Sequence, residues 1–412
     1  MRFISLNLPP RLAARAAAAA SERQRTIAAT ASRERDPRVD LFRGVALWFI
    51  FLDHVPSNVI SHLTLRNFGF SDATEIFVFV SGFSAALAYG RSERKLGFVY
   101  MTAHVWRRCW QLYVAHLILF LFYTAQIAWL ATRFSNPMYI EELNMTRFIE
   151  APHIALLEAL SLRFRPANLD ILPLYIVLLF AFPFVYRAMR ASPVVTILAS
   201  LGLYLCARYL DWNLPTSVPD TGWYFNPFAW QLLFYIGVLC ALSPAGLRDA
   251  WRWRPWAGAV AAVYLVLSSL IVMSWEYAWL GDALTSTLPQ GMFDWLYPVD
   301  KTNLDVVRLF HFLALAYLVA HFVRRDARYL QSAWLRPLIA CGRQSLYVFC
   351  LGVFLSFVAH FFLVEFNPRL VAQLGVSVAG IGLMTLLAML LNWYRAREAT
   401  AAGRRSTRTV NG

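Results

Sequence analysis

Residues 39–56 read Val-Asp-Leu-Phe-Arg-Gly-Val-Ala-Leu-Trp-Phe-Ile-Phe-Leu-Asp-His-Val-Pro, an apolar run with ionisable residues at both ends. About 20 predominantly apolar residues are enough to span a bilayer as a helix. We therefore predict a transmembrane helix here, with Asp40 and Arg43 near its first end and Asp53 and His54 near its second. Because an ionisable side chain inside a membrane is costly, such residues normally face a cavity or a partner.

Apolar stretches of this kind recur along the whole chain. The 412 residues are 59% hydrophobic and 15% charged, whereas a soluble domain has about 45–50% apolar and about 25% charged residues. This composition predicts an all-α polytopic membrane protein, a bundle of about ten transmembrane helices in a lipid bilayer. The predicted helices cover residues 39–60, 72–90, 109–131, 169–187, 192–210, 226–243, 256–275, 304–323, 338–363 and 369–393.

The distribution of basic residues predicts the orientation of this bundle. If the N-terminus is cytoplasmic, the inner segments hold 27 of the 38 Lys and Arg residues and the outer loops hold 7. Cytoplasmic loops carry such an excess, so we expect both termini to be cytoplasmic. Residues 1–38 lack the apolar core of a signal peptide and are expected to form a flexible basic tail. Residues 39–393 then form the transmembrane domain, and residues 394–412 form a second basic cytoplasmic tail.

Other classes of protein are disfavoured by the charge and cysteine content. The net charge of +14 comes from basic residues in short loops between apolar stretches, which argues against nucleic acid as a partner. The five cysteines are scattered, so they predict neither a disulfide framework nor a metal site. The sequence also has no Walker A loop, no GxSxG elbow and no metal-spaced His/Cys cluster.

Arg43 and His54 are predicted to share one face of the first helix. Eleven residues at about 100° each return nearly to the same face, and their rise of about 1.5 Å per residue separates the two by about 16 Å. A guanidinium at the cytoplasmic end would bind phosphate or carboxylate of a donor. An imidazole at the outer end would remove a proton from an acceptor hydroxyl. Each also has an ordinary explanation, as a positive-inside anchor for Arg43 and a hydrogen-bonded packing residue for His54.

Two carboxylates, those of Asp53 and Glu75, are candidates to lie near His54. Asp53 lies about 100° round the helix, where it either orients His54 or stays hydrated at the outer boundary. Asp72 and Glu75 have the spacing of a capping box at the start of the next predicted helix. They therefore either initiate that helix or, in the case of Glu75, approach His54.

Further polar residues lie near the ends of later predicted helices. Asp170 opens the fourth, where its charge suits the helix dipole. Asp305, Arg308 and His311 share a face of the eighth, as a stripe that either belongs to the site or locks the bundle. Arg343 lies near the inner end of the ninth, within reach of a donor phosphate. The candidate substrate-binding residues are Asp40, Arg66, Asn67, Asp72, Asn168, Asp170, Asn226, Gln231, Arg308, His311 and Arg343, and the candidate catalytic residues are Arg43, Asp53, His54 and Glu75.

Long blocks of this sequence, spread in order over residues 35–395, resemble the OpgC family. The blocks are Arg35-Asp36, Asp40, Arg43-Gly44, Asp53-His54, Arg66-Asn67-Phe68-Gly69-Phe70, Ser81-Gly82, Asn168-Leu169-Asp170-Ile171-Leu172-Pro173, Phe225-Asn226-Pro227-Phe228-Ala229-Trp230-Gln231, Asp300-Lys301-Thr302-Asn303-Leu304 and the stretch from Gly342 to Gly352.

The resemblance implies a bacterial inner-membrane protein that modifies osmoregulated periplasmic glucans, typically by succinylation. The family is similar to the membrane acyltransferase type 3 group, whose motif is an Arg and a His separated by ten residues in the first helix, as Arg43 and His54 are. It implies acyl-CoA, with succinyl-CoA expected, as co-substrate, a glucan as acceptor and no bound cofactor or metal. His54 would then act as general base, steered by Asp53 or Glu75, and Arg43 would contact the donor.

Two other functions compete with acyl transfer. Ten helices with intramembrane Arg, His and Asp residues would also suit a transporter or permease pathway. A non-enzymatic membrane partner of glucan synthesis is a third interpretation. The absence of evident inverted halves, or of two matching helices broken by Gly or Pro, weakens the transporter interpretation. The residues alone leave open the acyl group and the oligomeric state.

Overall fold

The computed structural model describes residues 36–242, 253–287, 298–366 and 368–410, and all regular elements within these ranges are helices, apart from one isolated bridge between Pro215 and Gly222. The all-α prediction is therefore confirmed for this part of the chain. The α-helices are α2 (Pro37–Asp53), α3 (Ala73–Phe134), α4 (Met138–Glu142), α5 (Thr146–Glu150), α6 (Pro152–Leu160), α7 (Ile171–Ala191), α8 (Pro193–Tyr209), α9 (Pro227–Leu242), α11 (Pro255–Glu276), α12 (Ala278–Thr287), α14 (Val306–Phe322), α15 (Arg336–Arg343), α16 (Ser345–Glu365) and α17 (Leu370–Val410). Short 3-10 helices cover η1 (Val59–Leu63), η2 (Leu65–Asn67), η3 (Arg328–Gln331) and η4 (Ala333–Leu335).

Several helices have the length and composition of membrane spans. Among the described residues, five helices are long and apolar enough to cross a bilayer, namely α3, α7, α11, α16 and α17. Helices α8, α9 and α14 are also apolar but have only 16 or 17 residues. The chain is thus a multi-pass helical membrane protein, while the expected total of about ten crossings and the cytoplasmic side of both termini stay predictions.

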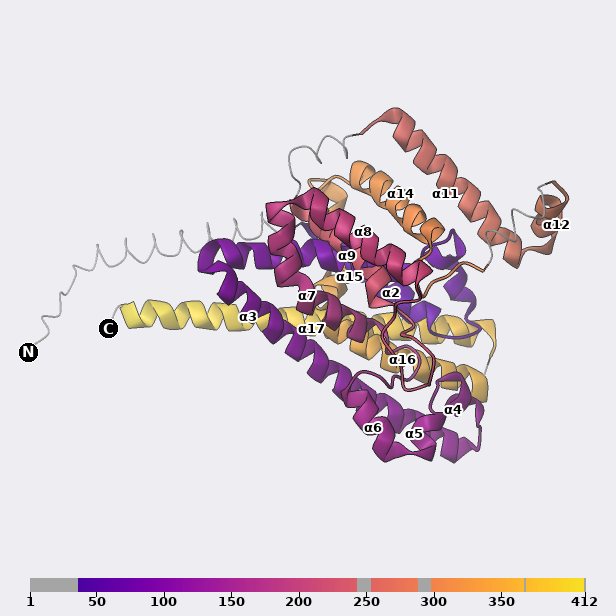
Figure 1. The fold of residues 1–412 in the computed structure, drawn as a ribbon. Helices are drawn as coiled ribbons and strands as arrows, with labels where there is room; N and C mark the ends of the chain where they lie inside the picture. The colour runs from indigo at the N-terminus through magenta and orange to yellow at the C-terminus, as the bar shows by residue number, and fades with distance from the viewer. Residues whose placement is uncertain (1–35, 243–252, 288–297, 367, 411–412) are drawn as a thin grey trace, which may run out of the picture.

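Helix α3 has 62 residues and would extend about 93 Å if it were straight. It bends at Gly97, whose φ of 85° and ψ of 172° lie in a region that favours glycine. In Figure 1 the helix runs to the left side of the molecule, turns and returns toward the lower right. The sequence predicted two helices over 72–90 and 109–131 with a loop between them. The predicted loop is wrong. The helix continues because the intervening Arg, Lys, Glu, Leu and Ala residues are good helix formers, and Gly97 alone supplies the bend.

The first helix is shorter than the predicted span of 39–60. Asp36 caps its N-terminus by accepting a hydrogen bond from the Arg38 N–H, and Pro37 occupies the first helical position. The helix ends at Asp53, because Pro56 has no N–H and disfavours the helical conformation of the residue before it. His54 therefore stands at the C-terminal cap of α2 and not in its middle turns.

Two other boundaries differ from the predictions. The helix predicted over 338–363 is divided at Gln344, whose φ of −110° and ψ of 32° are not helical, into α15 and α16. Helix α17 continues to Val410, so the described part of the predicted tail over 394–412 is helical. Most of the other predicted tail lies outside the described residues, which begin at Asp36.

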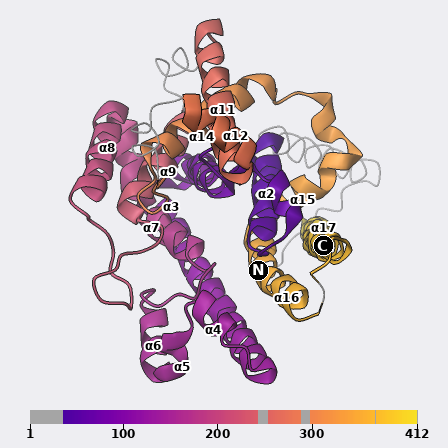
Figure 2. The same ribbon diagram turned by 90° about the vertical axis from the view of Figure 1, so that its right-hand side faces the viewer.

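The helices lie roughly along one long axis. In Figure 1 the bend of α3 and the C-terminal end of α17 lie on the left, whereas α4, α5, α6 and α12 lie on the right. Figure 2 looks along this axis and shows α2 between α7, α8 and α9 on one side and α15, α16 and α17 on the other. The helix that carries Arg43 and His54 is thus central to the fold.

Helices α2 and α15 approach closely through a reciprocal pair of glycines. A Cβ atom at Gly44 would overlap the backbone carbonyl of Leu338, and one at Gly342 would overlap the backbone carbonyl of Asp40. Because each glycine faces the backbone of the other helix, neither position has room for a side chain. This contact holds the first half of α2 in a defined position.

Candidate functional site

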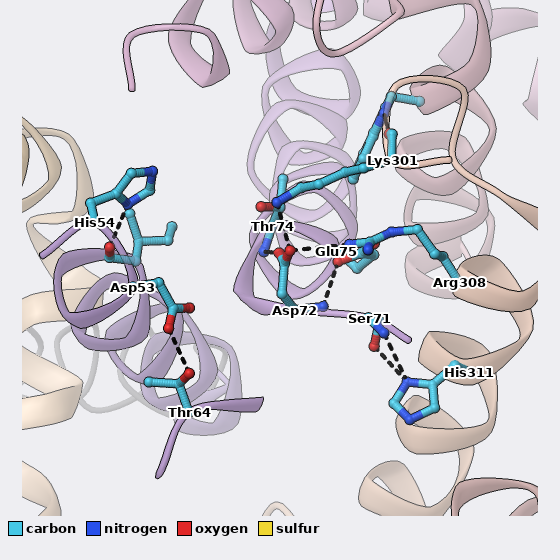
Figure 3. Close-up of polar contacts among 12 residues, drawn as sticks. Asp53, His54, Thr64, Ser71, Asp72, Thr74, Glu75, Lys301, Arg308 and His311 are labelled. Atoms are coloured by element: carbon cyan, nitrogen blue, oxygen red, sulfur yellow. Dashed lines mark hydrogen bonds and ion pairs between the residues drawn. The ribbon is translucent and has the colours of Figure 1, made fainter. Parts of the chain in front are cut away.

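His54 is oriented by the backbone of its own helix. Its Nδ1 atom lies 2.5 Å from the carbonyl oxygen of Ile50, one turn earlier (Figure 3). A carbonyl oxygen can only accept a hydrogen bond, so Nδ1 carries the proton and Nε2 holds the lone pair of the neutral ring. The cap geometry therefore presents Nε2 as the basic atom.

His54 lines a cavity with a volume of about 780 Å³. Its wall comes from the C-terminal end of α2, the start of α3, the segment 141–150, the start of α7 and the loops that precede α7 and α9. Cavities of about 300–1,000 Å³ are typical of small-molecule sites. Two further candidates from the sequence, Asn168 and Asp170, also line it, so the fold brings them to the same space as His54.

Four basic side chains line this cavity, and each has a partner. Arg147 forms a double hydrogen bond to Glu158, at 2.5 and 2.6 Å, and Arg163 donates to the carbonyl of Thr216 at 3.2 Å. Arg165 binds Asp170 at 2.8 Å and stacks over the Trp223 ring at 4.2 Å from its centroid. The fourth is Lys301. Glu141, Glu150 and Asp170 line the same cavity, so its wall carries charges of both signs.

Lys301 reaches the cavity from a loop that α9 holds in place. The indole Nε1 of Trp230 donates to the carbonyls of Lys301 and Thr302, both at 3.1 Å, and the Asn226 N–H donates to the carbonyl of Thr302 at 3.1 Å. The Lys301 Nζ then lies 2.6 Å from Oδ2 of Asp72. A loop and a helix start that are 229 residues apart thereby meet at the cavity wall.

Asp72 begins α3 with the predicted capping box. Its carboxylate accepts from the Thr74 N–H at 2.7 Å, and Glu75 accepts from the Asp72 N–H at 2.8 Å. Burial opposes ionisation of Asp72, but Lys301 and Arg308 hold its pKa well below the usual range. Asp72 therefore stays ionised, and the capping interpretation of this pair is confirmed.

Glu75 turns toward α14. Its Oε1 lies 2.8 Å from Nε and 2.7 Å from Nη2 of Arg308, and Arg308 also reaches Asp72 at 3.1 Å. The Glu75 side chain is 0% exposed. In Figure 3 the group of Asp72, Glu75, Lys301 and Arg308 lies across from His54. The carboxylate of Glu75 is thus paired with Arg308 in this structure.

Asp53 and His311 are each engaged with a hydroxyl. The Thr64 hydroxyl donates to Asp53 at 2.6 Å, and in Figure 3 Asp53 and His54 extend to different sides of α2. The Nδ1 of His311 lies 2.7 Å from the Ser71 hydroxyl and 3.3 Å from the Ser71 backbone nitrogen. Since the backbone N–H must donate, Nδ1 of His311 accepts. Asp53 thus braces the turn after α2, and His311 braces the segment before α3.

Two smaller cavities adjoin this group. One of about 340 Å³ is lined by Arg66, Asn67, Asp72 and Arg308, all predicted candidates, together with aromatic rings from the 68–70 segment and from 275–277. The other, of about 360 Å³, is lined by Asp53 and shares Arg66 and Asn67 with the cavity of about 340 Å³. The predicted site residues at this end of the bundle therefore surround three neighbouring cavities.

The remaining candidates do not line these cavities. At the other end of α2, Arg343 approaches Asp40 at 3.4 Å, next to the contact between α2 and α15. Asn226 donates to the carbonyl of Trp212 and to Asn303, both at 2.7 Å, and supports the loop of Lys301. Asp40, Arg43, Asn226, Gln231, His311 and Arg343 line none of the three cavities described.

Gln231 is bound within the helix packing. Its side chain accepts from the Ser200 hydroxyl at 2.5 Å and donates to the Ser200 carbonyl at 2.7 Å. Both residues are buried between α8 and α9. The expectation that Gln231 and Asn226 contact substrate has no geometric support, because their polar groups are used to join helices and loops.

The sequence pointed to Lys301 only through a family block and to the cavity arginines only as outer-loop charges. Lys301 is one of two lysines in a chain with 38 Lys and Arg residues, and a solitary outer lysine is a signal that would have singled it out. Arg163 and Arg165 belong to the short run Arg-Phe-Arg, just before the predicted Asn168 and Asp170.

Among the described residues, no group of three His, Cys, Asp or Glu side chains is placed to hold a metal ion. None of the five cysteines, all of which lie in the described part of the chain, forms a disulfide. The groups that the site presents are an oriented imidazole and basic side chains around a polar cavity.

The fold and the site together define the class of protein. It is an all-helical multi-pass membrane protein with a polar cavity at one end of a central helix. The family model described as OpgC protein matches residues 35–396, nearly the whole chain. The chain belongs to the OpgC family, and membership indicates a membrane acyltransferase that acts on periplasmic glucans. A search of curated protein sequences finds no match.

Proposed function

We propose that this protein transfers an acyl group, with succinyl as the expected one, from cytoplasmic acyl-CoA to hydroxyls of periplasmic glucans. The observation that carries the proposal is the orientation of His54, whose Nδ1 is bound to the Ile50 carbonyl while the residue lines a cavity of about 780 Å³. Membership in the OpgC family supplies the class of reaction and acceptor. The proposed location is the bacterial inner membrane.

In the proposed reaction His54 is the general base. Its Nε2 removes the proton from a glucosyl hydroxyl, and the oxygen attacks the carbonyl carbon of the thioester. The tetrahedral intermediate breaks its C–S bond, and the sulfur of CoA takes the proton from the imidazolium. An ester on the sugar and free CoA are the products. A base of this kind contributes about 10²–10⁴ in rate.

Arg43 is proposed to contact the donor. It lies on the same helix as His54 and about 16 Å from it by the rise of an α-helix, so it would meet the polar part of CoA and not the thioester carbon. Arg343 and Asp40 lie near the same end of α2. A donor that reaches from Arg43 to His54 would thus lie along α2.

The alternative is a transporter that uses the same charged residues. The family match favours the enzyme. In addition, two of the charged residues that a transporter pathway would use, Glu75 and Arg308, are bound to each other within the helix packing.

The test is to delete the gene and compare periplasmic glucans by mass spectrometry. Wild-type cells should carry succinyl-sized additions, which the deletion strain should lose. His54→Ala and Arg43→Ala proteins at normal membrane levels should fail to restore them. His153→Ala, which changes a residue of α6 that lines none of the cavities, should restore them fully.

Full substitution in cells with His54→Ala would overturn the mechanism. Unchanged glucans in the deletion strain, with altered uptake of a solute, would favour the transporter.

A further inference from the structure

The second cavity, of about 340 Å³, combines aromatic rings with polar and charged side chains. The rings belong to Phe68, Trp275 and Tyr277. These residues are 44%, 49% and 46% exposed, respectively. Arg66 contributes a guanidinium donor, and Asn67 contributes an amide whose NH2 donates to the Ser61 carbonyl at 2.7 Å. Aromatic residues near the ends of membrane helices often form an interfacial belt, but here they line a concave space together with ionisable groups.

This cavity lies one ion pair away from the cavity of His54. Asp72 lines the second cavity, whereas Lys301 and Thr74 line the first. The carboxylate of Asp72 binds both, at 2.6 Å from Lys301 Nζ and 2.7 Å from the Thr74 N–H (Figure 3). A single polymer could therefore occupy both spaces by passing over this ion pair.

The chemistry of the lining fits a sugar. The faces of a glucose ring carry C–H groups that pack on aromatic rings. Its hydroxyls accept hydrogen bonds from arginine, and they accept from or donate to side-chain amides. The third cavity, which shares His62, Arg66 and Asn67 with the second, extends the same surface toward Asp53.

We propose that the second cavity is a subsite that binds a neighbouring sugar unit of the same glucan whose hydroxyl is acylated beside His54. The inference rests on the proposed function and adds a way in which a polymer is preferred over a single sugar. Trp275 and Tyr277 provide the stacking surface, and Arg66 provides hydrogen bonds to hydroxyls. The subsite determines affinity for the acceptor and takes no part in the chemical step.

The experiment measures KM with the purified full-length protein, succinyl-CoA and two acceptors. One is the unsubstituted glucan isolated from the deletion strain, and the other is its short fragments, separated by size after partial hydrolysis. The Trp275→Ala/Tyr277→Ala variant should raise the KM for the intact glucan about tenfold, a usual effect of losing anchoring aromatic contacts. The ratio of the KM for fragments to the KM for intact glucan should fall by the same factor.

Trp279→Ala is the matched control. Trp279 is 71% exposed on the neighbouring helix α12 and does not line the cavity, so this variant should keep the wild-type KM for both acceptors. Because KM does not depend on the fraction of protein that is active, partial loss of folded protein does not affect the comparison. Trp275→Phe, which retains a ring, provides a milder variant if the double change does not fold.

Equal KM values for the Trp275→Ala/Tyr277→Ala and Trp279→Ala variants would overturn the proposed subsite while leaving the proposed function intact. Absence of acyl transfer by the wild-type protein to either acceptor, or full activity of His54→Ala, would overturn the proposed function itself.

Discussion

The Nζ atom of Lys301 lies 2.6 Å from Oδ2 of Asp72, and this ion pair joins the loop before α14 to the start of α3 at the cavity of His54. The same carboxylate accepts from Arg308 at 3.1 Å. Asp72 thus binds two cations and a helix start at once. This arrangement fixes the Lys301 loop and α14 against the start of α3 at the cavity wall.

We expect Lys301→Met to lower acyl transfer at least tenfold. Breaking a largely desolvated ion pair costs about 3 kcal/mol, and the loop would no longer be held against α3. The measurement is the rate of glucan acylation at saturating succinyl-CoA. Lys95→Met removes the other lysine of the chain, which is exposed within α3, and should retain the wild-type rate. Equal rates for the two variants would show that the ion pair does not position the site.

The pH dependence of stability should reveal the charge on Asp72. Lys301 and Arg308 hold its pKa below the unfolded value of 3.8, so its ionised form stabilises the fold at every pH above that value and the contribution is lost as the pH falls toward the folded pKa. Asp72→Asn should therefore melt at a lower temperature than wild type at pH 7. The gap should persist to about pH 5 and narrow at lower pH. A gap that is constant down to pH 3, in thermal scans in detergent, would contradict this assignment.

Asp53→Asn should reduce acylation by less than about tenfold, whereas His54→Ala should reduce it by about 10²–10⁴. The reason is that Asp53 accepts a hydrogen bond from Thr64 while the His54 ring is oriented by the Ile50 carbonyl. Thr64→Val removes the same hydrogen bond from the other side and should match Asp53→Asn. If Asp53→Asn proves as inactive as His54→Ala while Thr64→Val does not, Asp53 acts on His54 directly.

Gly342→Ala should lower the stability of the protein by about 1–3 kcal/mol, the usual cost of overpacking. Its Cβ would overlap the Asp40 carbonyl and force α2 and α15 apart. Gly375→Ala in α17, where a Cβ meets nothing within 4 Å, is the control and should be neutral. Thermal unfolding and membrane level of the two variants give the comparison, and equal stabilities would show that the α2–α15 contact adapts at little cost.

Much of the architecture could be predicted because membrane helices carry their signal locally. The apolar stretches located α7, α8, α9, α11 and α14 to within a few residues, whereas the short helices α4, α5, α6 and α12 lie where no helix was predicted. Other differences arise at particular residues. Pro56 ends α2 early, Gly97 replaces a loop with a bend, and Gln344 divides one predicted helix into two. The first two follow from the local chemistry of proline and glycine, whereas Gln344 donates a hydrogen bond to Asn392 of α17, a contact that depends on how the helices pack.

The sequence by itself determined that Arg43 and His54 share one helix, because their spacing and the helical rise are local properties. It also determined the capping box of Asp72 and Glu75, which lies within four consecutive residues. Only the tertiary structure decided which partners these groups meet. Glu75 binds Arg308 across 233 residues, Asp72 binds Lys301 across 229, and His54 opens into a cavity built from segments far apart in the chain. Such contacts depend on how the helices pack, and a hydropathy pattern contains no information about which charged side chains will meet.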